Sequence, residues 1–367
     1  MFRLDRKFFS QFDWTLLFLL LLVCGMALFN LYSASYPPKQ WGISPYVKQC
    51  YFYGMGSCLI LGLLLFDYKV LHYWNYPLYL LGVGALIVVL FMGKSAGGAA
   101  RWIGFGPIKI QPSELAKLIM VITLASYYSR KEEVKGYSLQ QLVTPIILTA
   151  LPFFLIMMQP DLGTALMLGI IFVSMTIFVK LRLSTYLVFG GTVMVGVVTA
   201  WKVLLKEYQK QRVLTFLNPE DDKLGHGYQI VQSKIAVGSG GKLGKGYLEG
   251  TQGHLHFLPE RYTDFAFSVW GEEWGFLGSL FFLVAYFILL IWGLNVALSA
   301  RDRFGVLLAY GVVMLVFWQA VINLLMILGF LPVVGIPLPL VSYGGSSLLT
   351  TLMAFGILMN VRMRRFG

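Results

Sequence analysis

Charged residues are scarce in this chain: 13% of its 367 residues are Asp, Glu, Lys or Arg, whereas 57% are hydrophobic. A soluble globular protein carries about 25% charged residues. The chain therefore has too few charges to cover a water-facing surface. This absence excludes an ordinary soluble enzyme and indicates a protein whose surface faces lipid.

Cysteine is also rare. An odd number of cysteines inside apolar segments makes neither a disulfide framework nor a metal-ligand spacing; the three are Cys24, Cys50 and Cys58. Two histidines, His254 and His256, stand two residues apart with no third ligand at a recognisable spacing. The sequence therefore predicts no protein-held metal site.

Acidic residues number 17 against 29 basic residues, which gives a net charge of +12. Such an excess can indicate nucleic-acid binding, but here the basic residues separate apolar runs and form no single patch. Nucleic acid is therefore not an expected partner, and the charges instead report the orientation of the chain in a membrane.

Long apolar runs are abundant, and each is about as long as the hydrocarbon core of a bilayer requires. They must be helical, because lipid cannot satisfy bare backbone groups. The first run, Trp14 to Leu31, is too long for a secretory signal. We expect an all-α polytopic membrane protein with spans near 14–35, 46–66, 75–93, 113–129, 142–158, 162–180, 184–205, 265–295, 304–330 and 345–361.

The distribution of Lys and Arg predicts the topology. An even number of spans places both termini on one side, where fourteen basic residues fall against five in the opposite short loops. Both termini are therefore expected in the cytoplasm. The segment 206–263 becomes a large extracytoplasmic loop between the seventh and eighth spans, within a single domain covering 1–367.

Two segments on the outer side begin helices in the same way: Gln111-Pro112-Ser113-Glu114 and Gln159-Pro160-Asp161. Proline suits a first helical turn, and an acid there meets the positive end of the helix dipole. Glu114 and Lys117 fall on one helix face, with Lys117 about one turn into the membrane. The pattern fits either a structural ion pair or a cavity that binds a polar head group.

The extracytoplasmic loop contains two further patterns. Tyr228 to Val237 carries an apolar stripe at helical spacing, which predicts a short helix on the membrane surface. The glycine-rich run from Gly238 to Gly246 fails the phosphate-loop pattern, because Ser239 stands where the first glycine belongs and Gly246 follows Lys245. We interpret this run as a flexible connector.

Asp264 is the sharpest local feature, since it stands where a polar loop gives way to an apolar helix. Partial desolvation there would make it a better proton acceptor. Glu272 and Glu273 follow inside the same apolar span, and acids in a membrane are costly enough to suggest function. The alternative is structural, with these acids capping helices or pairing with Arg261 and Arg212.

Five stretches resemble the SEDS proteins (shape, elongation, division and sporulation), and within them the RodA branch. They occur in order along nearly the whole chain. They are Ala100–Gly104 with Gln111–Lys117, Gln159–Thr164, Gly227–Ser233, Gly250–Phe265 and Gly335–Ser347.

The resemblance implies a peptidoglycan glycosyltransferase that polymerises lipid II on the outer face of the bacterial cytoplasmic membrane during cell elongation. It also implies a class B penicillin-binding protein, a transpeptidase, as partner. Asp264 in the Thr-Asp-Phe motif corresponds to the acid implicated in catalysis. The substrate-binding residues that the motifs imply are Arg101, Glu114, Lys117 and Asp161.

The implied reaction inverts the anomeric carbon of lipid II in one step, which needs a general base and stabilisation of the departing pyrophosphate. Asp264 would take the proton from the attacking hydroxyl. Arg101 and Lys117 would offset the leaving charge, with Mg²⁺ or Mn²⁺ as a candidate assistant. Two competing functions remain open: a lipid II flippase, and a non-catalytic scaffold for the transpeptidase. The missing inverted repeat disfavours the flippase, and the acid at Asp264 disfavours the scaffold.

Overall fold

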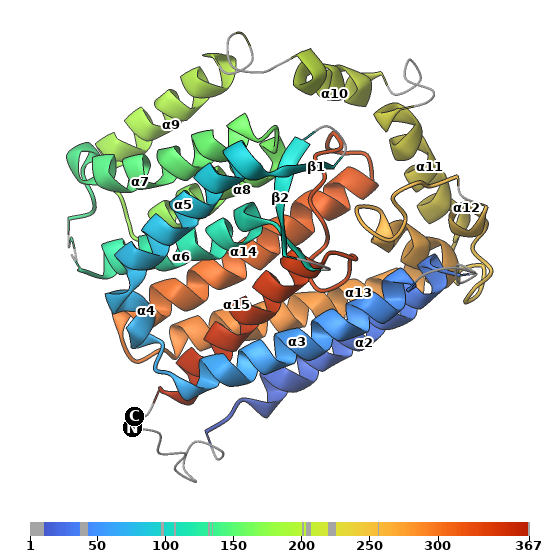
Figure 1. The fold of residues 1–367 in the computed structure, drawn as a ribbon, viewed down its shortest axis with the longest axis horizontal. Helices are drawn as coiled ribbons and strands as arrows, with labels where there is room; N and C mark the ends of the chain where they lie inside the picture. Colours follow the sequence, from blue (N-terminus) through green and yellow to red (C-terminus); the bar gives the residue numbers. More distant parts are fainter. Residues whose placement is uncertain are drawn as a thin grey trace.

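The computed structural model describes residues 11–36, 43–96, 99–105, 108–130, 133, 135–199, 202, 207–218, 225–255 and 257–365. Ten long helices occupy the positions of the ten expected spans and form one bundle (Figure 1). They are α2 (Trp14–Ala34), α3 (Pro45–Leu65), α5 (Asn75–Met92), α6 (Pro112–Arg130), α7 (Leu139–Met158), α8 (Leu162–Phe178), α9 (Leu183–Thr199), α13 (Ala266–Leu298), α14 (Arg303–Ile327) and α15 (Gly345–Met363).

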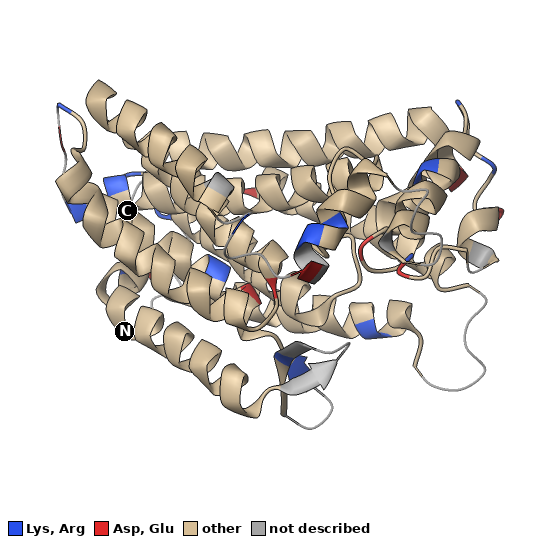
Figure 2. Cartoon of the chain, turned by 90° about the horizontal axis from the view of Figure 1, so that it is seen from above, with Lys and Arg blue, Asp and Glu red and all other residues tan. Residues whose placement is uncertain are grey.

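Seven helices in the described part of the chain are individually long and apolar enough to cross a membrane, and α8 and α9 are shorter apolar helices. Helix α6 has 19 residues but contains Glu114, Lys117 and Arg130, which lower its mean hydropathy. Elsewhere the helices run for many turns without a charged residue (Figure 2). The expectation of an all-α polytopic membrane protein is confirmed.

Helices α14 and α15 form the centre of the bundle. Most of their apolar residues are buried, and they pack against each other and against α6, α3 and α13. Helix α3 is mostly exposed along its length. Because an extended exposed apolar surface is unusual in water and suits lipid, this gradient separates a packed interior from a lipid-facing perimeter.

One acid joins the two ends of the described chain. The side chain of Asp13 accepts a hydrogen bond from Leu16 N at 2.9 Å and so caps α2. Its Oδ2 also lies 3.2 Å from Arg362 Nε of α15 and 2.9 Å from Trp292 Nε1 of α13. The start of α2 and the end of α15 therefore lie on one side, which the excess of Lys and Arg identifies as cytoplasmic.

Short elements gather at the opposite, extracytoplasmic end (Figure 1). The connection between α5 and α6 forms an antiparallel sheet that the sequence did not reveal; its strands are β1 (Lys94–Ala96), β2 (Ala99–Phe105) and β3 (Ile108–Ile110). The long loop contains α10 (Glu207–Leu217), α11 (His226–Ser239) and α12 (Thr251–His254). The remaining short helix, α4 (Lys69–Tyr73), follows α3 and lies at the cytoplasmic end, near the two termini (Figure 1).

Helix α11 confirms the short helix expected from Tyr228 to Val237. It packs along α13 and also contacts α14. The Ser233 hydroxyl lies 2.9 Å from Ser268 Oγ of α13 and donates to Ile327 O of α14 at 2.8 Å. The apolar stripe of α11 is thus partly covered by other helices of the protein.

The glycine-rich run from Gly238 to Gly246 forms the end of α11 and then a packed loop, so its interpretation as a flexible connector was wrong. Helix α13 is kinked at Gly275, where φ is 61° and ψ is −160°. Around the kink, Lys245 N donates to Glu272 O at 3.0 Å, and Phe276 N donates to Gly241 O at 2.9 Å. Glycine is needed because a Cβ on Gly244 would lie 2.0 Å from Glu273 O.

Candidate active site

The backbone around Asp264 is held by two elements that are distant in sequence. The amide of Asn323 in α14 donates to Asp264 O and to Ile336 O, each at 2.8 Å. Next to it, Tyr343 N donates to Tyr262 O at 2.7 Å. The turn before α13 is therefore fixed between α14 and the loop 331–344.

The carboxylate of Asp264 is partly buried, and among the described residues it makes no hydrogen bond. A Cβ added to Gly335, whose φ is 73°, would lie 3.6 Å from Asp264 Oδ2. Loss of water contact, and then the charge of Glu260, raise the pKa of Asp264 to about 6, while Arg212 of α10 opposes the shift. A rigidly placed carboxylate with open acceptor positions and a raised pKa suits a general base.

A second polar cluster surrounds Asp161, the residue that caps α8. Its carboxylate accepts from Thr164 Oγ1 and from Gln111 Nε2, each at 3.0 Å, and from Ser113 Oγ at 3.4 Å. Arg101 of β2 lies beside it, with Nη1 at 3.9 Å from Oδ1. The cluster thus ties the starts of α6 and α8 to the sheet.

The geometry of Arg101 is set by the Gln-Pro-Asp turn. Its guanidinium donates to Gln159 O at 3.4 Å and to Pro160 O. The Arg101 side chain remains 32% exposed whereas that of Asp161 is 6% exposed. Arg101 is therefore accessible to an anion from the extracytoplasmic side, while the buried Asp161 is its fixed counter-ion.

Glu114 and Lys117 form the ion pair that their spacing predicts. Lys117 Nζ lies 2.8 Å from Glu114 Oε1, and both side chains are almost fully buried. They lie one turn apart in the first two turns of α6, directly after the Gln111–Ser113 segment. The pair alone is compatible with either interpretation of these residues.

The Pro/Gly-rich loop 331–344 connects Asp264 with the Arg101 side of the site. Gly335 of this loop adjoins Asp264. The preceding residue, Val334, packs against the first turn of α8, where a Cβ on Gly163 would lie 2.6 Å from Val334 O. Just beyond the loop, Ser346 Oγ in the first turn of α15 accepts from Gln111 N at 3.0 Å. The structure therefore brings the predicted residues to one connected extracytoplasmic region.

A model of the family described as cell cycle protein, FtsW/RodA/SpoVE, matches residues 13–366. The chain belongs to this family. It is accordingly a multi-pass protein of the bacterial cytoplasmic membrane, and the SEDS resemblance of its five motifs is confirmed.

Three similar proteins support the assignment to the FtsW/RodA/SpoVE family. The chain is 40% identical over 299 residues to peptidoglycan glycosyltransferase MrdB of Escherichia coli K12, covering 81% of this chain and 80% of that protein. It also resembles a chain of a peptidoglycan synthase complex that coordinates polymerization and crosslinking, with 34% identity, TM-score 0.83 and coverage of 97% and 98%. The rod shape determining protein RodA of Thermus thermophilus matches with 28% identity, TM-score 0.72 and coverage of 97% and 98%.

The other two acids of the apolar span are structural in this family member. Glu272 accepts from Lys245 Nζ at 2.6 Å and from Thr251 N at 2.8 Å, so it caps α12 and fixes the glycine-rich loop. Glu273 accepts from the Ser33 hydroxyl of α2. Glu272 therefore caps a helix, as the structural alternative allowed, and it pairs with Lys245. Sequence reasoning missed Lys245 because the glycine-rich loop was read as a flexible connector.

The described residues contain no group of three or more His, Cys, Asp or Glu side chains that could hold a metal ion. His256, and the side chain of His254, lie outside the described part of the chain. The single carboxylate of Asp264 fits a cation held mainly by a substrate's phosphates, the usual manner of Mg²⁺.

Proposed function

We propose that this chain polymerises lipid II into glycan strands on the outer face of the cytoplasmic membrane during cell elongation, with Asp264 as the general base. Its relatives bear the name peptidoglycan glycosyltransferase, and the chain shares that enzyme class. The single observation that supports the role of Asp264 is its carboxylate, which is anchored through its backbone and hydrogen-bonded to none of the described residues.

In the proposed reaction, Asp264 removes the proton from the acceptor sugar hydroxyl as its oxygen attacks the anomeric carbon of lipid II. The bond from that carbon to the pyrophosphate breaks with inversion, as in a one-step displacement with a single base. A positioned base of this kind typically contributes about 10²–10⁴-fold. The raised pKa of Asp264 places its proton affinity closer to neutral pH, where a base works best.

The basic residues of the region stabilise the departing pyrophosphate in this proposal. Arg101 is exposed enough to bind it and is oriented by Asp161. Lys117, held by Glu114, supplies a second positive charge beneath it. Preorganised charges stabilise a developing anion more strongly than water does. A divalent cation, Mg²⁺ or Mn²⁺, is proposed to travel with the pyrophosphate and to offset its charge further.

A class B penicillin-binding protein is the proposed partner, since a similar chain belongs to a complex that coordinates polymerization and crosslinking. Glycan strands released beside a transpeptidase would be crosslinked as they form. The lipid tail of the substrate requires an opening to the bilayer, and membrane lipid is therefore the third expected contact of the chain.

The test is polymerisation of labelled lipid II by the purified protein, comparing wild type with Asp264→Asn and Asp264→Ala, with and without the transpeptidase and Mg²⁺ or Mn²⁺. Wild type should yield glycan ladders, and both variants should lose them without melting below the wild-type temperature. Asp67→Asn, the same change at the cytoplasmic end, is the matched control and should retain activity. Retained polymerisation in both Asp264 variants would show that Asp264 is not the general base. Lipid II crossing liposomes with no ladder under any condition would identify a flippase.

A further inference from the structure

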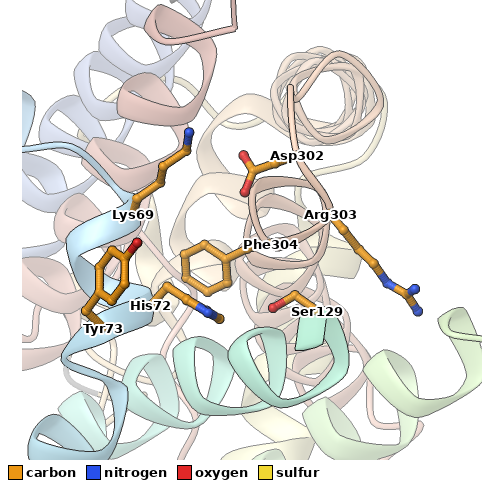
Figure 3. Close-up of a pocket in the computed structure, with 7 residues that line it drawn as sticks. All are labelled: Lys69, His72, Tyr73, Ser129, Asp302, Arg303 and Phe304. Carbon is orange, nitrogen blue, oxygen red and sulfur yellow. The ribbon is translucent and has the colours of Figure 1, made fainter. Parts of the chain in front are cut away.

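A cavity of about 300 Å³ lies at the cytoplasmic end of the bundle, on the side opposite Asp264. It is formed where α4, the end of α6 and the start of α14 meet (Figure 3). A single water needs only about 10–15 Å³ of such space. The cavity therefore has room for a ligand of several non-hydrogen atoms.

Three charged residues line this cavity, and two of them face each other across it without pairing. The third, Arg303, directs its guanidinium away from the other two (Figure 3). Lys69 of α4 and Asp302 at the start of α14 extend from opposite walls above the aromatic rings (Figure 3). Among the described residues, the Lys69 ammonium makes no ion pair or hydrogen bond, and the one hydrogen bond of the Asp302 carboxylate comes to Oδ1 from the Tyr68 hydroxyl. An ammonium and a carboxylate oxygen thus face the same space, each with capacity for a ligand.

The floor of the cavity is aromatic and fixed. The rings of His72 and Phe304 lie 4.9 Å apart, and Tyr68 stacks on Phe304 with centroids 6.3 Å apart. His72 is held by its ring Nδ1, 3.0 Å from Ser126 Oγ. Burial and the charge of Arg130 lower the pKa of His72 against the opposing effect of Asp302, so the imidazole is neutral at pH 7 and adds no cation. Such a floor suits the methylene groups and the ammonium of a small ligand.

The position of the cavity along the membrane normal points to lipid. Tyr73, which lines it, and the adjacent Trp74 are 79% and 60% exposed. Tyr and Trp with exposed rings at helix ends are typical of the level of the lipid head groups. Basic pockets between transmembrane helices on the cytoplasmic side also bind lipid head groups, and this cavity adds an acid, Asp302, to its basic residues.

We propose that this cavity binds the head group of a phospholipid that carries both a phosphate and a primary ammonium, the phosphatidylethanolamine class, from the cytoplasmic leaflet. Lys69 binds the phosphate, and Asp302 Oδ2 accepts hydrogen bonds from the ammonium over the ring of Phe304. A purely anionic head group would place its charge beside Asp302, whereas a zwitterionic one satisfies both walls.

The test measures binding of short-chain lipids to the purified full-length protein in detergent by native mass spectrometry. The probes are phosphatidylethanolamine, phosphatidylglycerol, phosphatidylcholine, free O-phosphoethanolamine and inorganic phosphate. The variants are Lys69→Gln and Asp302→Asn, the latter retaining an oxygen that can accept from Tyr68. Lys135→Gln, an exposed lysine in the connection after α6, is the matched control.

Wild type should bind phosphatidylethanolamine about tenfold more tightly than the other two lipids, the size expected of one charge-assisted hydrogen bond in a partly wet site. Lys69→Gln should weaken that binding by a similar factor, and Asp302→Asn should abolish the preference over phosphatidylglycerol. Lys135→Gln should bind as wild type does. If Asp302→Asn fails to fold, Lys69→Gln and the lipid comparison decide the matter.

Equal binding of all three lipids by wild type would overturn the proposal, and so would unchanged selectivity in both variants. If O-phosphoethanolamine binds as tightly as the lipid, the cavity recognises a soluble ligand and the proposal of a lipid ligand is overturned. Inorganic phosphate binding as tightly would show that the ammonium is not recognised.

Discussion

Lys117 and Glu114 form an ion pair of 2.8 Å that is almost completely removed from solvent, one turn apart near the start of α6. Desolvating two charges is costly, and a buried pair of this kind is often no more stable than apolar residues of the same size. The pair is therefore hard to explain by stability alone, which agrees with a role in binding the pyrophosphate.

Replacing one partner of this pair should destabilise the protein, because it leaves the other charge buried. Glu114→Gln should lower stability by about 3–5 kcal/mol, whereas the double variant Glu114→Gln, Lys117→Met should recover most of the loss. The recovered variant should still not polymerise lipid II. Melting temperatures and glycan ladders for the single and double variants check both statements.

The exposed pair Lys210–Glu207 of α10 has nearly the same geometry, with 2.9 Å between Nζ and Oε1. Glu207→Gln should therefore change the melting temperature very little, since exposed pairs are worth about 0–1 kcal/mol. Wild-type polymerisation by the double variant at positions 114 and 117 would show that the buried pair is only structural.

The rate of polymerisation should depend on the ionisation of Asp264. A base must be deprotonated, so kcat/KM should rise about tenfold per pH unit at acid pH and level off above the raised pKa of Asp264, about 6. Because Glu260 helps to raise that pKa, Glu260→Gln should move the midpoint to lower pH. Initial rates between about pH 4.5 and 8 measure both effects. An unchanged midpoint in Glu260→Gln would contradict the assignment of the titrating group to Asp264.

The same pKa shift has a consequence for stability. A carboxyl group whose pKa rises on folding destabilises the native state as pH increases from its ordinary value of 3.8 to about 6. At neutral pH the ionised Asp264 is therefore unfavourable for folding. Asp264→Asn should be at least as stable as wild type at pH 7, and the difference should shrink toward pH 4 in thermal unfolding experiments.

Glu272 should be essential for the order of the extracytoplasmic loop. It is fully buried and bonds Lys245, Thr251 N and Gln252 N, so it joins α12 and the glycine-rich loop to α13. Glu272→Gln loses the ion pair but keeps an acceptor oxygen, and we expect a loss of about 1–3 kcal/mol. Hydrogen exchange at Thr251 and Gln252 should increase as well.

Glu249→Gln is the control for this change, because Glu249 is an exposed acid in the same loop. It should leave melting temperature and exchange as in wild type. Unchanged exchange at α12 in Glu272→Gln would mean that the loop is ordered by its glycine packing instead.

A divalent cation should act only together with the substrate. The described residues offer no cluster of three ligands, so the protein alone should not bind Mg²⁺ or Mn²⁺ measurably at micromolar concentration. EDTA should nevertheless lower polymerisation, and excess Mg²⁺ or Mn²⁺ should restore it. Calorimetry of the protein with Mn²⁺, with and without lipid II, is the measurement. Binding without lipid II would indicate a resident metal site, and activity unaffected by EDTA would indicate that no metal is needed.

Much of the architecture could be predicted because it depends on local composition. A span needs a run of apolar residues long enough for the bilayer, and the run from Trp14 to Ala34 meets that condition whatever it packs against. The ion pair at Glu114 and Lys117 was likewise readable, because three residues along a helix always share a face.

Contacts between distant segments could not be predicted in this way. The sheet of β1–β3 and the pairing of Lys245 with Glu272 depend on how the loop folds back on the helices. Gly275 is one glycine among 39 in the sequence, and its positive φ becomes visible only where the glycine-rich loop packs against the kink.

The sequence by itself determined the number and approximate limits of the membrane helices, their orientation and the motifs that carry the family resemblance. Bilayer thickness, the positive-inside rule and helix periodicity act on neighbouring residues, so they can be read along the chain. Only the tertiary structure decided that Asn323 anchors Asp264, that Asp161 orients Arg101 and that Glu272 serves the fold. Those relationships join residues far apart in the chain, and their energies depend on burial and on distances that no local pattern specifies.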